Sequence, residues 1–116
     1  MASPRVEPLE RAKKRLDRLD LYPRPVRTRR VRIFVAPALF RLLWFRRFDG
    51  YAAWNTILLR AEPLDAADDD LITHELCHVW QMQHRPLAMP LSYLRGYASN
   101  RYEAEAREAV EQTRVR

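Results

Sequence analysis

Hydrophobic positions along the chain recur with two periods, one helical and one typical of strands. Leucines at helical spacing among charged residues predict an amphipathic helix over residues 6–22. Residues 31–35 alternate and then run apolar, which predicts a first strand, and residues 51–60 predict one or two further strands in a hairpin or meander. Apolar positions among residues 65–83 predict a buried helix. Together these elements predict an α+β fold.

Prolines divide the N-terminal half. Pro23 and Pro25 end the first helix, because proline lacks a backbone N–H and clashes with the preceding turn. Residues 37–47 then predict a short helix that begins at a proline, and residues 49–50 predict a turn. The positions of this short helix expected to face the core are Leu39, Leu42, Leu43 and Trp44.

The C-terminal part predicts two more helices. Residues 91–97 form a short one, because Pro90 interrupts the preceding helical pattern. Asn100 is the expected N-cap of the last helix, and Glu103 stands third after it, as in a capping box. This last helix is expected to continue through Val110.

The length of 116 residues suffices for one domain with a single modest core. We expect residues 1–30 to form the amphipathic helix and a basic linker, and residues 31–116 to form the core. The formal net charge is +6, and five arginines lie between residues 24 and 32. Such a cluster permits phosphate contacts, but no recognition helix and no strand aromatics for RNA accompany it. A solvated linker is therefore favoured, and nucleic acid is not an expected partner.

The single cysteine and the hydropathy of the chain bear on disulfides, membrane insertion and cellular location. Cys77 is the only cysteine, so no internal disulfide forms, and we expect it to be a small buried residue that faces the core. The most apolar stretch, residues 33–48, is interrupted by Pro37 and three arginines and is too short to span a bilayer. No apolar leader is evident near residue 1, so we expect no transmembrane segment and a cytoplasmic location.

Residues 74–78, with the sequence His-Glu-Leu-Cys-His, carry the most specific chemistry. Residues four apart on a helix are offset by about 40° and about 6 Å, so His74 and His78 can reach the same ion. Glu75 lies about 100° further round, where it can take a proton from a water beside that ion. The pattern predicts a zinc site with Glu75 as general base.

A catalytic zinc site needs a third protein ligand, and three side chains are candidates. His84 stands ten residues after the first histidine of the motif, but an unbroken helix would carry it about 15 Å away. Glu103 and Glu105 lie on the predicted last helix, and the residue pattern leaves the choice between them open. A tyrosine, Tyr97 or Tyr102, is expected to stabilise the developing oxyanion.

Residues 74–81, His-Glu-Leu-Cys-His-Val-Trp-Gln, resemble the His-Glu-Leu-Thr-His-Val-Val-Gln segment of the metallopeptidase domain associated with extracellular contractile injection systems. The chain is thus similar to a minimal gluzincin over about residues 31–112. The resemblance implies a zincin-like fold, in which a small sheet of about three strands packs on the His-Glu-x-x-His helix between N-terminal and C-terminal helices. It also implies that Glu103, which opens a Glu-Ala-Glu-Ala run, completes a Zn²⁺ site. Arg107 stands where the family has an aspartate.

Three functions remain open from the sequence. The favoured one is a zinc-dependent hydrolase, in particular a peptidase, whose peptide or protein substrate would pair with a sheet edge near residues 56–60. The second is a non-catalytic, zinc-stabilised module that docks onto a protein partner or a larger assembly. The third is a basic adaptor for nucleic acid or a membrane surface, in which the motif is incidental.

Overall fold

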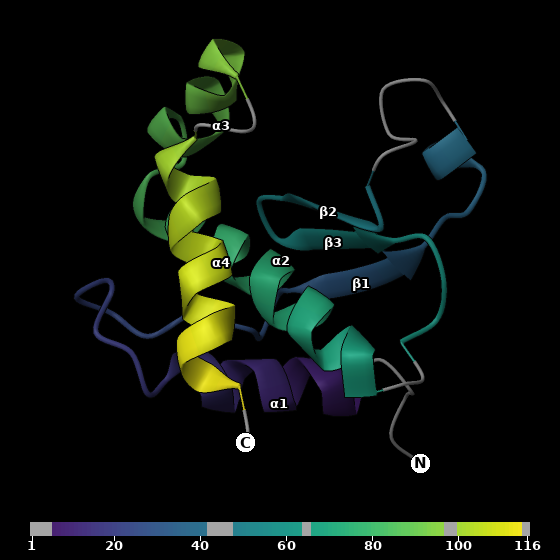
Figure 1. Cartoon of the computed structure of the whole chain (residues 1–116), viewed down its shortest axis with the longest axis horizontal. Coiled ribbons are helices and arrows are strands. Elements are labelled where there is room, and N and C mark those ends of the chain that lie inside the picture. Colours follow the sequence, from purple (N-terminus) through teal and green to yellow (C-terminus); the bar gives the residue numbers. More distant parts are fainter. Residues whose placement is uncertain (1–5, 42–47, 64–65, 97–99, 115–116) are drawn as a thin grey trace.

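The computed structural model describes residues 6–41, 48–63, 66–96 and 100–114. This part of the chain contains four α-helices and a three-stranded mixed sheet, so the predicted α+β class is confirmed. Figure 1 shows the sheet above α2 (Ala66–His84), α1 (Val6–Leu16) beneath that helix, and α4 (Arg101–Thr113) crossing in front of it.

The sheet contains β1 (Arg32–Val35), β2 (Gly50–Ala53) and β3 (Thr56–Leu59) in the spatial order β1–β3–β2. β3 pairs with β1 in parallel and with β2 antiparallel, so the predicted first strand and hairpin are confirmed. The expectation that residues 56–60 form a sheet edge is wrong, because β3 returns from the hairpin into the space between the other two strands. Among the described residues, β2 is the edge strand that packs on α2.

A two-residue turn of Trp54 and Asn55 joins β2 to β3. Trp54 has a φ of 52°, in the left-handed region that residues other than glycine rarely adopt. Its backbone N–H lies 3.2 Å from Sδ of Met82, and its indole Nε1 donates to the carbonyl oxygen of Pro86 at 3.1 Å. These contacts hold the turn against the C-terminal end of α2.

The first helix is shorter than the sequence predicts. α1 ends at Leu16 rather than near residue 22, and the amide of Leu19 bonds to the carbonyl of Leu16 at 3.0 Å in a tightened last turn. The chain then turns so that Leu19 and Tyr22 pack on the core formed by α2. Tertiary packing of these side chains therefore overrides the helical periodicity that continues past Leu16.

Two short elements also differ from the sequence prediction. Of the helix predicted over residues 37–47, the structure describes one 3₁₀ turn, η1 (Leu39–Arg41), in which Phe40 is buried. Leu42, Leu43 and Trp44 lie outside the described residues. The chain then bends at Asp49, as expected, and Gly50 already begins β2.

The helix predicted over residues 91–97 begins earlier, as α3 (Ala88–Ser92), and continues into the 3₁₀ turn η2 (Tyr93–Arg95). Pro90 lies inside α3 because its missing N–H costs nothing in the first helical turn. Residue 97 lies outside the described part.

The N-cap predicted for the last helix is confirmed. Oδ1 of Asn100 accepts hydrogen bonds from the backbone amides of Tyr102 and Glu103 at 2.8 and 3.1 Å. The helix runs to Thr113, three residues beyond the expected Val110.

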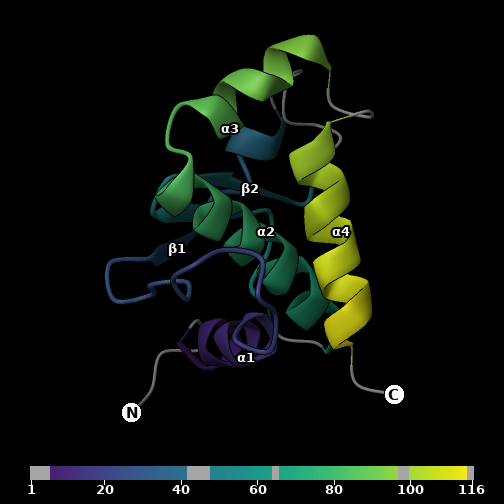
Figure 2. The same ribbon diagram turned by 90° about the vertical axis from the view of Figure 1, so that its left-hand side faces the viewer.

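α2 lies at the centre of the core. The sequence predicts this helix over residues 65–83, and its end at His84 agrees to within one residue. It packs against α1, α4, β2 and β3, and Figure 2 shows it between α1 below and the sheet, with α4 alongside. Cys77 is fully buried, as expected. Residues from both α1 and the rest of the chain belong to one hydrophobic cluster.

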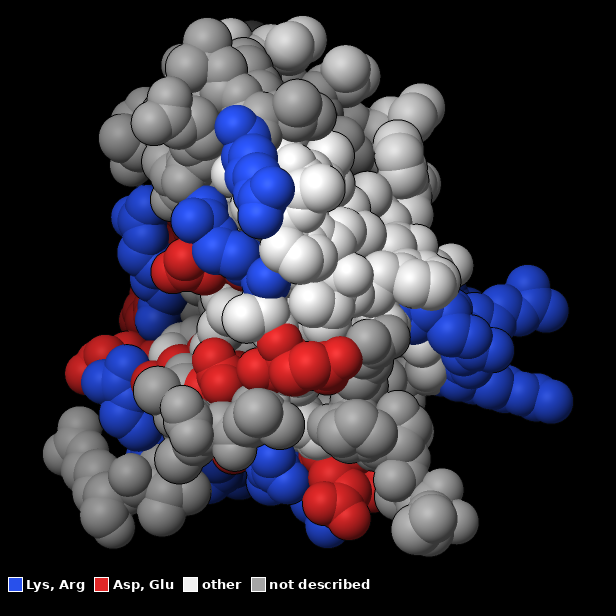
Figure 3. Space-filling view, turned by 90° about the vertical axis from the view of Figure 1, so that its right-hand side faces the viewer, with Lys and Arg blue, Asp and Glu red and all other residues white. Residues whose placement is uncertain are grey.

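The basic charge is partly neutralised by ion pairs between helices. Arg11 and Arg15 of α1 pair with Asp69 and Asp70 of α2 at 2.9 Å each. On the face shown in Figure 3, acidic side chains form a band across the middle, and basic side chains lie above it and at the edges. That face therefore carries charges of both signs. Within the described ranges, no helix is long and apolar enough to cross a membrane.

Candidate metal centre

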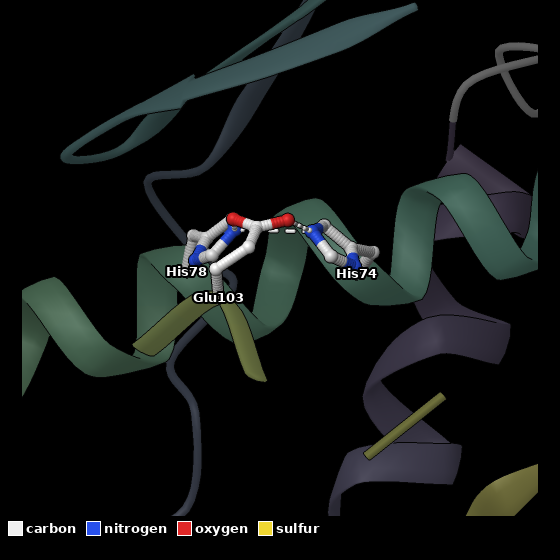
Figure 4. Close-up of side chains that lie close together, drawn as sticks. All are labelled: His74, His78 and Glu103. Atoms are coloured by element: carbon white, nitrogen blue, oxygen red, sulfur yellow. Dashed lines mark hydrogen bonds and ion pairs between the residues drawn. The ribbon is translucent and has the colours of Figure 1, made fainter. Parts of the chain in front are cut away.

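Three side chains from two helices converge on one point. His74 and His78 extend from α2 and Glu103 from α4, and one ligand atom of each lies within 4.8 Å of the others. The Nε2 atoms of His74 and His78 lie 2.7 and 3.0 Å from the two carboxylate oxygens of Glu103, and 3.1 Å from each other. Figure 4 shows the carboxylate between the two imidazole rings, with one oxygen directed toward each.

The local sequence explains this convergence. His74 and His78 are one helical turn apart on α2, so both rings leave the same face. Glu103 lies in the first turn of α4, whose start is fixed by the Asn100 cap. Ala106 is fully buried, and its small side chain lets α4 pack closely on α2.

The structure separates the three candidates for a third ligand. Glu103 is the candidate that joins the two motif histidines in the described part of the chain. Glu105 lies about 200° further round the helix and instead accepts a hydrogen bond from the Tyr22 hydroxyl at 2.6 Å. His84 stacks on the Tyr22 ring at the end of α2, with the ring centroids 4.9 Å apart. Glu103 therefore has the position a third ligand needs, whereas the other two are engaged elsewhere.

Burial and charge set the protonation of the cluster. Burial alone would raise the pKa of Glu103, but hydrogen bonds from His74 and His78 hold that pKa well below its ordinary value. Burial alone would lower the pKa of His78, but its hydrogen bond to Glu103 and the charge of Glu75 raise it overall. The carboxylate is therefore ionised, and it attracts a positive charge to the space it shares with the two rings.

The donor set suits a zinc ion. Two imidazole nitrogens and one carboxylate oxygen are the ligands of a common class of catalytic zinc sites, which leave a fourth position open. The ionised and nearly fully buried carboxylate of Glu103 also provides the negative charge that a divalent cation needs in a desolvated place. The residues present therefore fit the metal that the sequence motif predicts.

Glu75 lies on α2 beside the cluster and borders the open space on both sides of it. Its side chain is 6 % exposed. Burial raises the pKa of Glu75, and the neighbouring charges of His78 and His74 offset only part of that rise. A carboxyl group with a raised pKa exchanges protons near neutral pH more readily than an ordinary one, as a general base must.

Two residues of the site were not identified from the sequence. Oε1 of Gln81 lies 2.8 Å from Nδ1 of His78, and the spacing of three residues on one helix is a signal that could have indicated this contact. The hydroxyl of Tyr93 donates to Oε2 of Glu103 at 3.0 Å. No motif marks Tyr93, because its place depends on how the α3–η2 segment packs beside α2.

Of the two tyrosines expected near the oxyanion, only Tyr102 can be compared with the structure. Tyr97 lies outside the described residues. Tyr102 is buried, and its hydroxyl accepts a hydrogen bond from the guanidinium of the preceding arginine at 2.9 Å. Tyr93, which was not expected there, borders the site, with its ring centroid 6.2 Å from that of His78.

The cluster lies between two hollows of different character. On the side of His74, an open hollow of about 460 Å³ is lined mainly by charged side chains, including Asp70 and Arg107. On the side of His78, a pocket of about 290 Å³ is mainly apolar. Its apolar lining comes from β2, the end of α2 and the α3–η2 segment, and includes Tyr51, Ala52, Met82, Met89, Pro90, Tyr93 and Leu94.

Comparison with protein-family models, curated proteins and solved structures gives no match for this chain. The family resemblance of the motif therefore stays a prediction. The converging side chains of α2 and α4 and the hollows beside them are the observations on which a function can be proposed.

Proposed function

We propose that the protein is a zinc-dependent hydrolase of zincin-like, gluzincin type that cleaves peptide bonds. His74, His78 and Glu103 would bind the zinc ion, and Glu75 would act as general base. The observation that carries the proposal is that the three ligand atoms lie within 4.8 Å of one another. Glu103 on α4 is at least 25 positions along the chain from the two histidines on α2, so the fold brings these side chains together.

Each side chain has a chemical task in this proposal. When bound, zinc would supply a Lewis acid and lower the pKa of a coordinated water to about 7. Glu75 would accept the proton of the attacking water and return it to the leaving amine. Tyr93, through its hydrogen bond to Glu103, would hold the carboxylate in place.

The surroundings favour an extended peptide as substrate. β2 is the sheet edge beside the cluster in the described part of the chain, and an edge strand can pair with a peptide through main-chain hydrogen bonds. A peptide lying along β2 would place one side chain in the apolar pocket next to His78. The substrate class proposed is therefore an unstructured polypeptide with an apolar residue beside the cleaved bond.

The test combines metal analysis with hydrolysis. The purified protein should contain about one zinc per chain and cleave an unfolded protein such as reduced casein. Glu75→Gln should keep the zinc and lose the hydrolysis, because the amide cannot accept a proton. Hydrolysis at the normal rate in Glu75→Gln, or a folded wild-type protein that binds no zinc, would overturn the proposal.

A second candidate, a non-catalytic zinc-stabilised docking module, is favoured by the burial of the cluster. Glu103 and His78 are 2 % and 6 % exposed, so a metal ion there would bridge α2 and α4 inside the fold. This candidate predicts that a chelator unfolds the protein and that no peptide is cleaved. The peptidase predicts that chelation abolishes hydrolysis while the helical circular dichroism persists.

A further inference from the structure

A series of hydrogen bonds connects His78 to the segment that follows α1. Nδ1 of His78 lies 2.8 Å from Oε1 of Gln81, and Nε2 of Gln81 donates to Oε1 of Glu105 at 3.1 Å. The hydroxyl of Tyr22 donates to the same carboxylate oxygen at 2.6 Å. These four residues, here called the relay, come from the segment after α1, from α2 and from α4.

The contacts of Gln81 decide which way its amide faces. Its Nε2 also lies 2.8 Å from the backbone carbonyl oxygen of Tyr102. A backbone carbonyl oxygen only accepts hydrogen bonds, so the group of Gln81 that faces it must be the NH₂ group. Oε1 therefore faces His78, and because an amide oxygen cannot donate, Nδ1 of His78 must carry a proton. Gln81 has no exposed surface, so the arrangement is fixed by protein groups.

A proton on Nδ1 leaves Nε2 as the nitrogen that faces the proposed zinc site. Nε2 of His78 is the atom that lies 3.0 Å from Glu103 and 3.1 Å from His74. A metal-binding histidine needs this division, with one nitrogen donating its proton to a fixed acceptor and the other presenting a lone pair.

We propose that Gln81, Glu105 and Tyr22 are positioning residues for the zinc site, in which Tyr22 and Glu105 hold the Gln81 amide and the amide fixes the tautomer and ring orientation of His78. The inference rests on the proposed function. It gives the carboxylate of Glu105 a role that it exerts through the amide of Gln81. It also makes the N-terminal segment part of the site.

The place of the Tyr22 hydroxyl is set by aromatic packing. The Tyr22 ring meets Trp80 edge to face, with the centroids 5.4 Å apart, and stacks on His84. Burial and the hydrogen bond to Glu105 raise the pKa of Tyr22, so the hydroxyl remains a donor at physiological pH. Because both neighbouring rings belong to α2, the donor is anchored to the helix that carries His78.

The tautomer can be read directly by nuclear magnetic resonance. In the charged ring both nitrogens of His78 carry protons, and Nε2 donates to Glu103. When the ring is neutral, long-range ¹H–¹⁵N spectra of the metal-free protein should show the remaining proton on Nδ1, which faces Oε1 of Gln81. Adding zinc should then shift the Nε2 resonance of His78 and leave Nδ1 protonated. The metal-free spectrum tests the inference even if zinc fails to bind. Failure of the inference can therefore be distinguished from failure of the proposed function.

Variants locate the effect within the relay. Gln81→Leu should lose the Nδ1 preference and weaken zinc binding by about 10- to 100-fold, and Tyr22→Phe should weaken it by a smaller factor. Glu105→Gln keeps an acceptor oxygen and should retain the His78 tautomer and the zinc affinity, whereas Glu105→Ala leaves the Gln81 amide held by the Tyr102 carbonyl alone and should weaken both. Tyr102→Phe is the matched control, because it removes a buried hydroxyl outside the relay and keeps the carbonyl that Gln81 bonds.

Circular dichroism and thermal unfolding show which variants fold. A folded Gln81→Leu with the wild-type tautomer and zinc affinity would overturn the inference, as would equal effects of Tyr22→Phe and Tyr102→Phe. If Gln81→Leu does not fold, the contrast between Glu105→Gln and Glu105→Ala decides in its place. A His78 that carries its proton on Nε2 in the neutral wild-type protein would also overturn the inference.

Discussion

Gly50 on β2 lies so close to Glu75 on α2 that a β-carbon at position 50 would come within 3.3 Å of Cγ of Glu75. It would also lie 3.1 Å from Cδ1 of Leu71 and 3.3 Å from Cδ2 of Leu59. These distances are tighter than ordinary van der Waals contact. The glycine therefore allows the edge strand to approach the motif helix at the proposed general base.

Gly50→Ala should displace Glu75 by a few tenths of an ångström and slow hydrolysis while sparing the metal ligands. We expect kcat to fall about 10-fold, because small misplacements of a reacting group are costly, and zinc affinity to stay at the wild-type level. Steady-state kinetics and zinc titration measure the two effects. Ala53→Ser, a small change at the other end of β2, is the control. Parallel losses of kcat and zinc affinity would contradict this assignment of Gly50.

Glu103→Gln should weaken zinc binding by about 100-fold or more, because loss of a ligand costs more than the loss of an outer partner. Competition with a chromogenic chelator measures the affinity. The matched control is Glu108→Gln on the same helix, since Glu108 is exposed and accepts a hydrogen bond from Gln112 rather than from a histidine. Equal affinity in the two variants would remove Glu103 from the ligand set.

Ala52→Val should change substrate preference by narrowing the apolar pocket that Ala52 lines. The expected result is a fall of about 10-fold in kcat/KM for peptides with a large apolar side chain, with little change for alanine-containing peptides. Ala53→Val is the control, because successive strand residues face opposite sides and Ala53 is outside that lining. A uniform loss over all peptides would show that the pocket does not select side chains.

Asp70→Asn should lower the free energy of unfolding by about 1 kcal/mol at pH 7, since the carboxylate is partly exposed. Asp70 accepts hydrogen bonds from Arg15 at 2.9 Å and from Arg114 at 3.0 Å, which tie α1 and α4 to α2. Denaturant unfolding measures the loss. Asp17→Asn, which breaks the exposed pair with Lys13, is the control and should change stability little.

The ion pairs of Asp70 with Arg15 and Arg114 also predict that stability depends on pH. Burial raises the pKa of Asp70, but the hydrogen bonds from Arg15 and Arg114 lower it more, so its folded-state pKa lies below the ordinary value. Its stabilising contribution is therefore present above the unfolded-state pKa of about 3.9 and lost as the pH falls through the lower folded-state pKa. The difference between wild type and Asp70→Asn should accordingly shrink below about pH 4.

Local chemistry made part of the fold predictable. α2 shows a long apolar pattern with acidic residues at its start, and Asn100 is a residue type that caps helices. The hairpin was predictable as strands, but the place of β3 in the middle of the sheet was not, because sequence order does not determine which strands pair. Nor was the turn at Trp54, whose left-handed backbone is held by contacts with residues 82 and 86.

The site was predictable to the extent that it lies on one helix. The spacing of His74 and His78 fixes their common face, whereas the choice between Glu103 and Glu105 depends on how α4 is rotated against α2. Both acids are compatible with a helix, and only the packing of α4 shows which one faces the histidines. Tyr93 could not be predicted, because it reaches Glu103 across a break between two helical segments.

α2 contributes both histidines and Glu75, and it is also the helix against which α1, α4 and the sheet pack. The helix that holds the fold together is therefore also the helix that carries the proposed reacting groups. Heat inactivation should therefore coincide with melting of the whole domain rather than precede it. Tolerance to substitution should also be low at apolar positions well away from the motif, since any repacking of this helix moves the reacting groups.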